Sequence, residues 1–167
     1  MFDYPNHTFT LAKSGALASA GTSLRLEVSE RSGFPRTEIQ VEGTSYAVLL
    51  DTGASFTMVS QSVLASWGKA HPDWKRYPGA FGEAATLGGQ ALETMFVPRA
   101  TWHGHEPIDL GVVSQQTGVF ENWMSSMMTA PTVGSLAGNV LKRFRVDLDY
   151  PDQKLQLTAS SVAASTD

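Results

Sequence analysis

Apolar and polar residues alternate along several short segments of the chain, which is the pattern of strands that bury one face. The alternating apolar positions are Leu24, Leu26 and Val28, then Ile39 and Val41, then Val146 and Leu148, and finally Leu155 and Leu157. Between residues 74 and 113, Gly and Pro recur at a spacing that predicts successive hairpins. We therefore expect a mostly β fold.

One predicted hairpin leads directly to an aspartate. Gly43-Thr44 lies between the segments 37–42 and 45–50, and the second segment becomes fully apolar as it approaches Asp51. A turn of this kind between two strand-like segments favours a hairpin, and a run of consecutive apolar residues favours a buried strand. Asp51 is therefore expected at the end of a buried strand.

Two short helices are also predicted. The first is expected to begin after the N-cap Ser60 and to end at Gly68. Its apolar face would be formed by Val63, Leu64 and Trp67. The second is expected from about Asn139 to Phe144.

Composition favours a folded protein with one domain. Of the 167 residues, 42% are hydrophobic and 17% are charged, whereas a disordered chain would be poorer in apolar residues. The net charge of −4 offers no basic surface, so we expect neither nucleic acid nor a membrane surface as a partner. No cysteine is present, which excludes disulfides and thiolate zinc sites. No run approaches the ~20 apolar residues of a membrane span.

The sequence predicts three parts: an N-terminal extension (residues 1–20), a main domain (residues 21–158) and a tail (residues 159–167). The tail is expected to be disordered. The extension contains a repeat, because the segment Asp3–Leu11 parallels Asp149–Leu157 in order and apolar positions. Both segments are typical of a strand end, a turn and a strand. Either residues 1–11 are the last hairpin of a preceding homologous domain, or a common Tyr-Pro turn has been used twice by chance.

Candidate chemistry lies in two segments that are far apart in the sequence. The first is Asp51-Thr52-Gly53, a tripeptide that arises by chance in roughly one chain of this length in ten. Here, however, an apolar strand precedes it and a turn of small residues follows, as expected for a carboxylate held at the floor of a cleft. The second is Leu136-Ala137-Gly138, which is followed by the second predicted helix and by a terminal hairpin with its turn at Pro151.

These two motifs, in this order and spacing, resemble those of retropepsin-like and pepsin-like aspartic proteases. In those families an Asp-Thr/Ser-Gly loop is followed, late in the domain, by two apolar residues and Gly, a short helix and a hairpin. The resemblance covers about residues 24–157 and is strongest to bacterial single-domain retropepsin-like proteins, whose fold is half of a pepsin-like one. It implies an acid protease barrel with one or two short helices. Such bacterial relatives are often exported, which would place the protein in the periplasm or elsewhere outside the cytoplasm.

The resemblance implies an aspartic endopeptidase, in which a pair of Asp carboxylates activates a water and no metal or other cofactor is needed. This chain contains one Asp-Thr-Gly and no second Asp-Ser/Thr-Gly. Asp51 must therefore pair with its counterpart in a homodimer or with an Asp of a second homologous domain. The alternative is a retropepsin-fold module without catalysis that binds peptides or dimerises. A further possibility is a half-site that is inert until it meets its partner.

The roles of individual residues follow from the same resemblance. Asp51 would be catalytic, Thr52 would brace the paired loops through its hydroxyl, and Gly53 would allow close approach of the backbone. Ala54 replaces the Ser of pepsins, so we expect activity at a less acidic pH than theirs. The residues expected to contact a peptide or protein substrate are Ala54 and Ser55 and, in a flap hairpin over residues 78–84, Gly79, Phe81 and Gly82. A plain surface turn is the other explanation of that hairpin.

Other chemistries are less well supported by the residues. His103-Gly104-His105 has the two imidazoles of a metal pair but no clear third and fourth ligand, so a hairpin turn is expected and no metal site is assigned. Gly88-Gly89 is not followed by the Lys-Ser/Thr of a phosphate-binding loop. No Gly-x-Ser-x-Gly motif positions a serine nucleophile.

Overall fold

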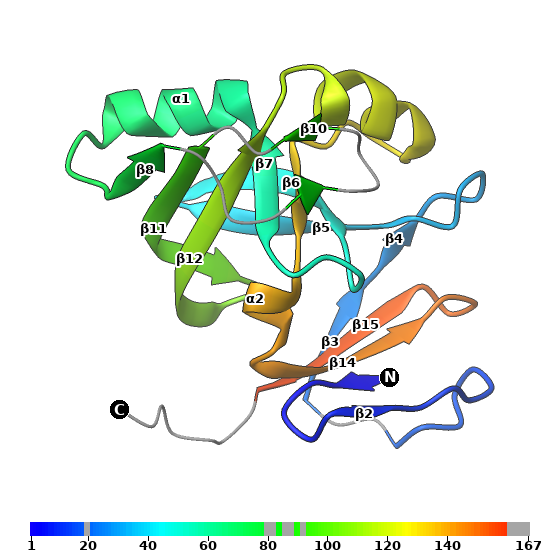
Figure 1. Cartoon of the computed structure of the whole chain (residues 1–167). Helices are drawn as coiled ribbons and strands as arrows, with labels where there is room; N and C mark the ends of the chain where they lie inside the picture. Colours follow the sequence, from blue (N-terminus) through cyan, green and yellow to red (C-terminus); the bar gives the residue numbers. More distant parts are fainter. Residues whose placement is uncertain (19–20, 79–82, 85–88, 91–92, 160–167) are drawn as a thin grey trace. The chain divides into compact units, whose positions relative to one another are not determined.

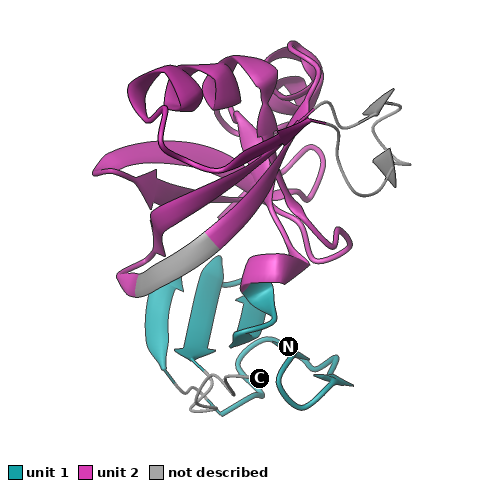
Figure 2. Cartoon of the chain, turned by 60° about the vertical axis from the view of Figure 1, so that its left-hand side comes forward, with its two compact units in different colours: residues 1–26, 141–167 teal, residues 27–140 magenta. Residues whose placement is uncertain are grey.

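The computed structural model describes residues 1–18, 21–78, 83–84, 89–90 and 93–159 (Figure 1). The chain forms two compact units (Figure 2). Unit 1 comprises residues 1–26 and 141–167, and unit 2 comprises residues 27–140. Strand accounts for 45% of the chain and helix for 17%, which confirms the predicted mostly β class.

Unit 2 contains a closed barrel of six strands. The strands follow the order β5, β6, β13, β7, β12 and β11, and β11 returns to β5 through the pairs Ala100–Val41 and Thr101–Gln40. Two strands, β4 and β8, extend this sheet, and β9 pairs with β10. The strands are β4 (Glu27–Val28), β5 (Pro35–Val41), β6 (Thr44–Leu50), β7 (Thr57–Ser60), β8 (Arg76–Pro78), β9 (Glu83–Ala84), β10 (Gly89–Gln90), β11 (Glu93–Trp102), β12 (His105–Gln115) and β13 (Gly134–Leu136).

The hairpin that leads to Asp51 forms as predicted, but its turn lies one residue earlier than the expected Gly43-Thr44, and Thr44 already belongs to β6. Strands β5 and β6 pair antiparallel around a turn at Glu42 and Gly43, whose φ angles of 48° and 77° are both positive. Two positive φ angles give the turn the twist that matches antiparallel strands. The last three residues of β6 are all buried, whereas the start of that strand is exposed. The apolar run therefore does mark where the strand enters the core.

The first predicted helix is confirmed at its start and is longer than predicted at its end. Helix α1 spans Gln61–Ala70, and the hydroxyl of Ser60 accepts a hydrogen bond from the N–H of Val63. Gly68 does not end this helix but lies buried within it. A Cβ at this position would collide with the guanidinium of Arg76. The glycine therefore makes room for a neighbouring side chain and does not act as a C-cap.

The second predicted helix is shorter than expected. Helix α2 covers only Gly138–Leu141, because strand β14 already begins at Phe144. Between β12 and β13, residues Val119–Met124 form a π-helical segment and residues Ser125–Met127 a 3₁₀ turn. Phe120 and Met124 are buried there in a cluster with Leu49 and Met128. This cluster supports the strand that delivers Asp51.

Unit 1 is built on a five-stranded sheet with the order β2, β1, β14, β15 and β3. The strands are β1 (Phe2–Asp3), β2 (Thr8–Phe9), β3 (Thr22–Arg25), β14 (Phe144–Asp149) and β15 (Lys154–Ala159). The alternation expected across Leu24–Val28 is divided at the fully buried Leu26, since β3 pairs with β15 and β4 pairs with β5. The sheet ends at Ala159, and the rest of the predicted tail lies outside the described residues.

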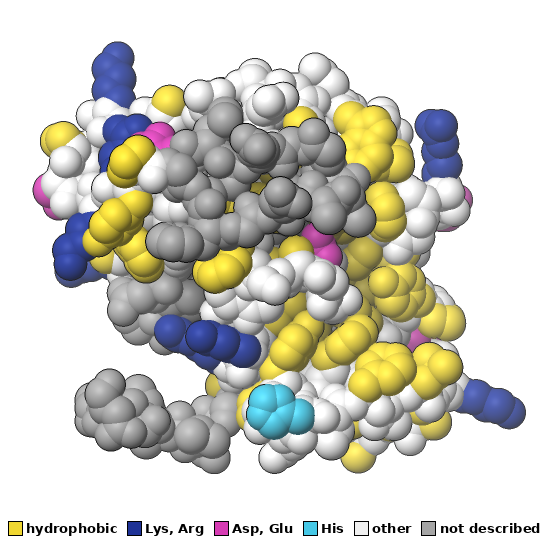
Figure 3. All heavy atoms as spheres, viewed as in Figure 1, with side chains coloured by type: hydrophobic (Ala, Val, Ile, Leu, Met, Phe, Trp, Pro, Cys, Tyr) yellow, Lys and Arg dark blue, Asp and Glu magenta, His cyan; other side chains and the backbone are white. Residues whose placement is uncertain are grey.

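Lys and Arg side chains are scattered over the face of the molecule shown in Figure 3 and do not gather into a patch. None of the helices in the described part of the chain has the length and apolar character needed to cross a membrane.

Candidate active site

Asp51 lies directly after β6 and is anchored through its backbone. Its N–H donates to the carbonyl of Leu136 over 2.9 Å, which continues the parallel pairing of β6 with β13. The residue before it, Leu50, is 2% exposed, whereas Asp51 itself is half-buried. The carboxylate therefore projects from a rigid strand end that still has access to solvent.

The loop after Asp51 holds one oxygen of its carboxylate. Oδ1 accepts hydrogen bonds from the N–H groups of Gly53 and Ala54, at 3.0 and 3.1 Å. Among the described residues, Oδ2 receives no hydrogen bond and Asp51 forms no ion pair. This arrangement fixes the orientation of the carboxylate and leaves its second oxygen available to a water, a substrate or another carboxyl.

The two sequence motifs lie against one another. Strand β13 inserts between β6 and β7, parallel to the first and antiparallel to the second. Just beyond it, the N–H of Gly138 donates to the carbonyl of Ala54, and that of Asn139 donates to the carbonyl of Ser55, both over 2.9 Å. The segment 136–139 therefore clamps the loop that carries Asp51.

The glycine at position 138 leaves room for this close approach. A Cβ there would lie 3.1 Å from the carbonyl oxygen of Ala54. That distance is shorter than ordinary van der Waals contact between carbon and oxygen, so a larger residue would require the loop to shift slightly.

One side chain in this region was not singled out by the sequence. The Asn139 Oδ1 accepts hydrogen bonds from both the N–H and the hydroxyl of Thr57, and its Nδ2 donates to the carbonyl of Gly111 over 2.7 Å. The hydroxyl of Thr57, a fully buried residue, accepts in turn from the N–H of Ala137. Asn139 thus joins α2, β7 and β12 behind the Asp51 loop. Its position directly after Gly138 was the only available signal.

The structure leaves several predicted roles as predictions. Thr52 is half-buried, and its hydroxyl has no hydrogen-bond partner among the described residues, as its expected partner would belong to a second domain. A Cβ at Gly53 would meet Asp51 Oδ1 at 3.5 Å, an ordinary contact, so this chain alone does not demand glycine there. The expected flap residues Gly79, Phe81 and Gly82 lie outside the described residues.

An apolar pocket of about 280 Å³ opens beside the segment that follows Asp51. It is lined by Phe56, Tyr77, Thr94, Phe96, Gly111 and Val113. Phe96 faces Gly111 across the β11–β12 ladder, and its ring meets that of Tyr77 edge to face at 5.8 Å. Because Gly111 has no side chain, the space opposite Phe96 stays open. The pocket is slightly smaller than the ~300–1,000 Å³ of sites for whole small molecules, a size that suits one side chain.

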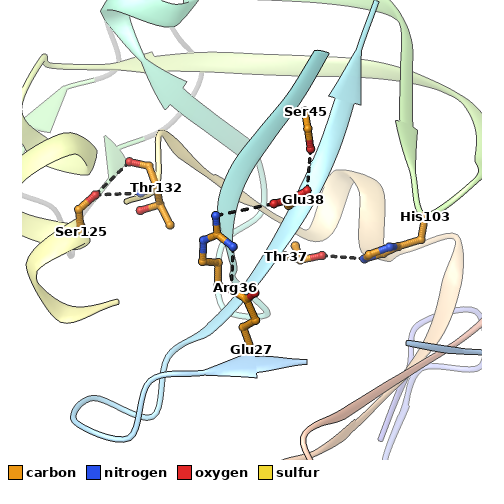
Figure 4. A network of polar contacts seen from close by, with 8 residues as sticks. All are labelled: Glu27, Arg36, Thr37, Glu38, Ser45, His103, Ser125 and Thr132. Carbon is orange, nitrogen blue, oxygen red and sulfur yellow. Dashed lines mark hydrogen bonds and ion pairs between the residues drawn. The ribbon is translucent and has the colours of Figure 1, made fainter. Parts of the chain in front are cut away.

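The two histidines of the candidate metal pair form part of a hairpin. His103 and Gly104, with φ angles of 49° and 79°, make the turn between β11 and β12. The His103 Nε2 atom is 3.0 Å from the hydroxyl of Thr37 (Figure 4). The same hydroxyl accepts a hydrogen bond from Trp102 Nε1. Burial lowers the pKa of His103, His105 lowers it further, and the nearby Glu38 opposes both. Among the described residues, no cluster of three or more His, Asp or Glu could hold a metal ion.

Comparisons with known proteins give only distant similarities. No protein family model matches the chain, and no curated protein matches it. A solved retropepsin-like aspartic protease from Rickettsia conorii is similar over 84% of this chain and 94% of its own, with 14% identity and a TM-score of 0.47. An aspartic proteinase from Irpex lacteus is similar over 89% of this chain, with 15% identity and a TM-score of 0.43. This chain spans only 50% of the latter. At these values the comparisons assign neither a family nor an activity.

Proposed function

We propose that this chain is one half of an aspartic endopeptidase, with Asp51 as its catalytic carboxylate. The observation that carries the proposal is the clamping of the Asp51 loop by residues 136–139, with Oδ1 held by two N–H groups. A carboxylate fixed on one oxygen and open on the other suits the activation of water. The two motifs that suggested this activity in the sequence are the two segments that meet here.

The chemistry requires a second carboxyl close to Asp51. Two carboxylates at hydrogen-bond distance share one proton, because both cannot ionise cheaply side by side. The ionised one removes a proton from water as the water oxygen attacks the scissile carbonyl carbon, and the protonated one donates to the carbonyl oxygen. The C–N bond then breaks as a proton passes to the leaving nitrogen. Asp51 supplies one carboxyl, and a partner domain or a second copy supplies the other.

The apolar pocket beside Phe56 supports a peptide as the substrate. Phe56 follows Asp51 by five residues, so the pocket lies within about 18 Å of it along the chain. An extended peptide advances ~3.3 Å per residue. The pocket would therefore accept a bulky apolar side chain within about five residues of the scissile bond, and we expect it to contribute to substrate preference.

Exchange of the Asp51 carboxylate tests the proposal. In Asp51→Asn the amide oxygen can still accept from Gly53 and Ala54, so the fold should persist while peptidase activity falls at least about a hundredfold. Asp73→Asn, at an exposed turn, serves as the matched control and should keep full activity. Activity of the unmutated protein should also be inhibited by pepstatin.

The same experiment separates the enzyme from the non-catalytic alternative. A peptide-binding module would bind unstructured peptides equally with Asp51 or Asn at this position, and it would cleave none. Equal cleavage by the unmutated protein and Asp51→Asn, under conditions where both are folded and paired, would refute the proposed role of Asp51.

A further inference from the structure

The two hairpins of unit 1 share one turn conformation. An offset of 146 residues superimposes the sequence Asp3-Tyr4-Pro5 on Asp149-Tyr150-Pro151. In the first turn, the N–H of His7 donates to the carbonyl of Tyr4 at 3.2 Å, and in the second, that of Gln153 donates to the carbonyl of Tyr150 at 3.3 Å. The sequence repeat is therefore also a repeat of backbone structure.

Side-chain contacts and backbone angles in the two turns agree as well. The N–H of Asn6 donates to Asp3 Oδ1, and the N–H of Asp152 donates to Asp149 Oδ1, both at 3.2 Å. His7 has a φ of 53° and Gln153 one of 50°. Both turns therefore place a residue other than glycine at positive φ in the same position of the turn.

The strand registers of the two hairpins are also the same. Phe2 pairs with Phe9 as Leu148 pairs with Leu155. Asp3 pairs with Thr8 as Asp149 pairs with Lys154. Turn, register and apolar positions therefore repeat together, over the whole length of the hairpin.

The hairpins lie side by side in a two-fold manner. Strand β1 pairs antiparallel with β14, through Phe2–Val146 and Asp3–Arg145. The sheet therefore runs β2, β1, β14, β15, with the equivalent strands β1 and β14 at its centre. Two equivalent antiparallel strands are related by a local two-fold axis, which is the symmetry of an interface between two like domains.

The exposure of the equivalent apolar residues differs sharply. Leu155 and Leu157 are 0% and 1% exposed, whereas their counterparts Phe9 and Leu11 are 64% and 88% exposed. A cavity of about 440 Å³, lined in part by Leu11, Leu17 and Leu148, adjoins this hairpin in unit 1. The N-terminal hairpin thus has the apolar pattern of a strand that covers a core, while Phe9 and Leu11 are largely exposed in the described part of the chain.

We propose that residues 1–11 are the final hairpin of a second, homologous domain, and that this domain is the natural partner of the one described. Phe9 and Leu11 would be buried in that domain's own core. Because β1 already occupies the outer edge of β14, a second copy of this chain cannot pair with that edge unless β1 leaves. The consequence for catalysis rests on the proposed function. The second catalytic carboxyl then comes from the homologous domain and not from a homodimer.

A tandem protein tests this inference. Residues 21–157 are fused to residues 12–167 of a second copy, so that the first copy's terminal hairpin takes the place of residues 1–11 without a change of register. The inference predicts a monomeric protein in which the amides of Arg145 and Val146 of the second copy exchange as slowly as in the unmodified chain. One of these two amides must bond to the neighbouring strand at its outer edge.

The readouts distinguish the two ideas. A slowly exchanging, monomeric tandem protein supports the homologous domain, whether or not it cleaves peptides. If that protein is folded but inactive, the proposed function and the origin assigned to the second carboxyl fail, while the assignment of residues 1–11 to a homologous domain stands. A folded tandem protein whose Arg145 and Val146 amides both exchange rapidly, or which associates through this edge, overturns the inference.

A smaller change covers the case in which the tandem protein does not fold. The substitutions Asn6→Asp, His7→Gln, Thr8→Lys, Phe9→Leu and Thr10→Gln make residues 3–11 identical to residues 149–157. Exchange at Arg145 and Val146 should change less than about threefold, which corresponds to less than 1 kcal/mol. The control places alternating Gly and Ser at the same five positions and should accelerate exchange of the outer-edge amide at least tenfold. Equal acceleration in both variants overturns the inference.

Discussion

The side-chain oxygen of Asn139 accepts both the backbone N–H and the hydroxyl of Thr57, each over 2.8 Å. The two residues are 82 positions apart, and Thr57 is fully buried. The shared acceptor fixes the start of β7 against α2, and the Asp51 loop leads directly into β7. The end of the Asp51 loop is therefore held by a contact that neither motif contains.

The hydroxyl of Thr57 provides the first prediction. Thr57→Val keeps the shape of the side chain but leaves the N–H of Ala137 without its acceptor, which costs about 1–3 kcal/mol for a buried donor. Thr57→Ser keeps the hydroxyl and loses one buried methyl, at about 0.8 kcal/mol. Urea denaturation should therefore rank Thr57→Ser above Thr57→Val in stability. The opposite ranking would contradict the role assigned to the hydroxyl.

A second prediction concerns Gly134 in β13. A Cβ at this position would overlap the carbonyl oxygen of Met58 and lie 3.1 Å from Val59 Cα, and both are backbone atoms of a paired strand. Gly134→Ala should therefore destabilise the protein by more than about 3 kcal/mol, above the usual range of overpacking. At Gly111, in contrast, a Cβ would meet Phe96 at an ordinary 3.6 Å, so Gly111→Ala should stay within about 1 kcal/mol of the parent. Thermal unfolding of both variants makes the comparison.

The apolar pocket gives a third prediction, which depends on the proposed function. Gly111→Val would fill the space opposite Phe96. An apolar pocket discriminates between side chains by about 10–200-fold, so we expect at least a tenfold loss of preference for peptides with Phe over Ala at the pocket position. The measurement is the ratio of kcat/KM for the two peptides. Cleavage of the Ala peptide is the internal control, and an unchanged ratio would remove the pocket from substrate recognition.

The fourth prediction is a pH dependence of stability. Burial lowers the pKa of His103 below its ordinary value of 6.5, so the unfolded chain binds more protons than the folded one as the pH falls through that value. The free energy of unfolding should therefore decrease from pH 7 toward pH 5.5 through this residue.

Replacement of His103 isolates its contribution. Asn is chosen because it tolerates the positive φ of this position. In His103→Asn the melting temperature should fall less between pH 7 and pH 5.5 than in the parent. His7→Asn is the matched control, because His7 is exposed and has a similar φ of 53°. It should retain the dependence of the parent. Equal slopes in His103→Asn and the parent would assign the effect to other groups.

Local rules in the sequence predicted those parts of the fold that depend on neighbouring residues. The hairpin of β5 and β6, the strand that buries Leu50 and the cap at Ser60 each follow from a few adjacent positions, and each is confirmed. The end of α1 was predicted wrongly, because Gly68 serves a contact with Arg76, which lies outside the helix. A glycine that ends a helix and a glycine that makes room for a neighbour look the same in a sequence.

By itself the sequence determined the mostly β class, the position of Asp51 after a buried strand and the two segments that form its surroundings. Only the tertiary structure decided that Asn139 holds Thr57 and that Phe96 and Gly111 face each other beside a pocket. Those relationships depend on strand order and register, which join residues far apart in the chain. The interpretation of the hairpin of residues 1–11 needed both the sequence and the structure. The repeat is visible in the sequence, whereas the exposure of Phe9 and Leu11 is visible only in the fold.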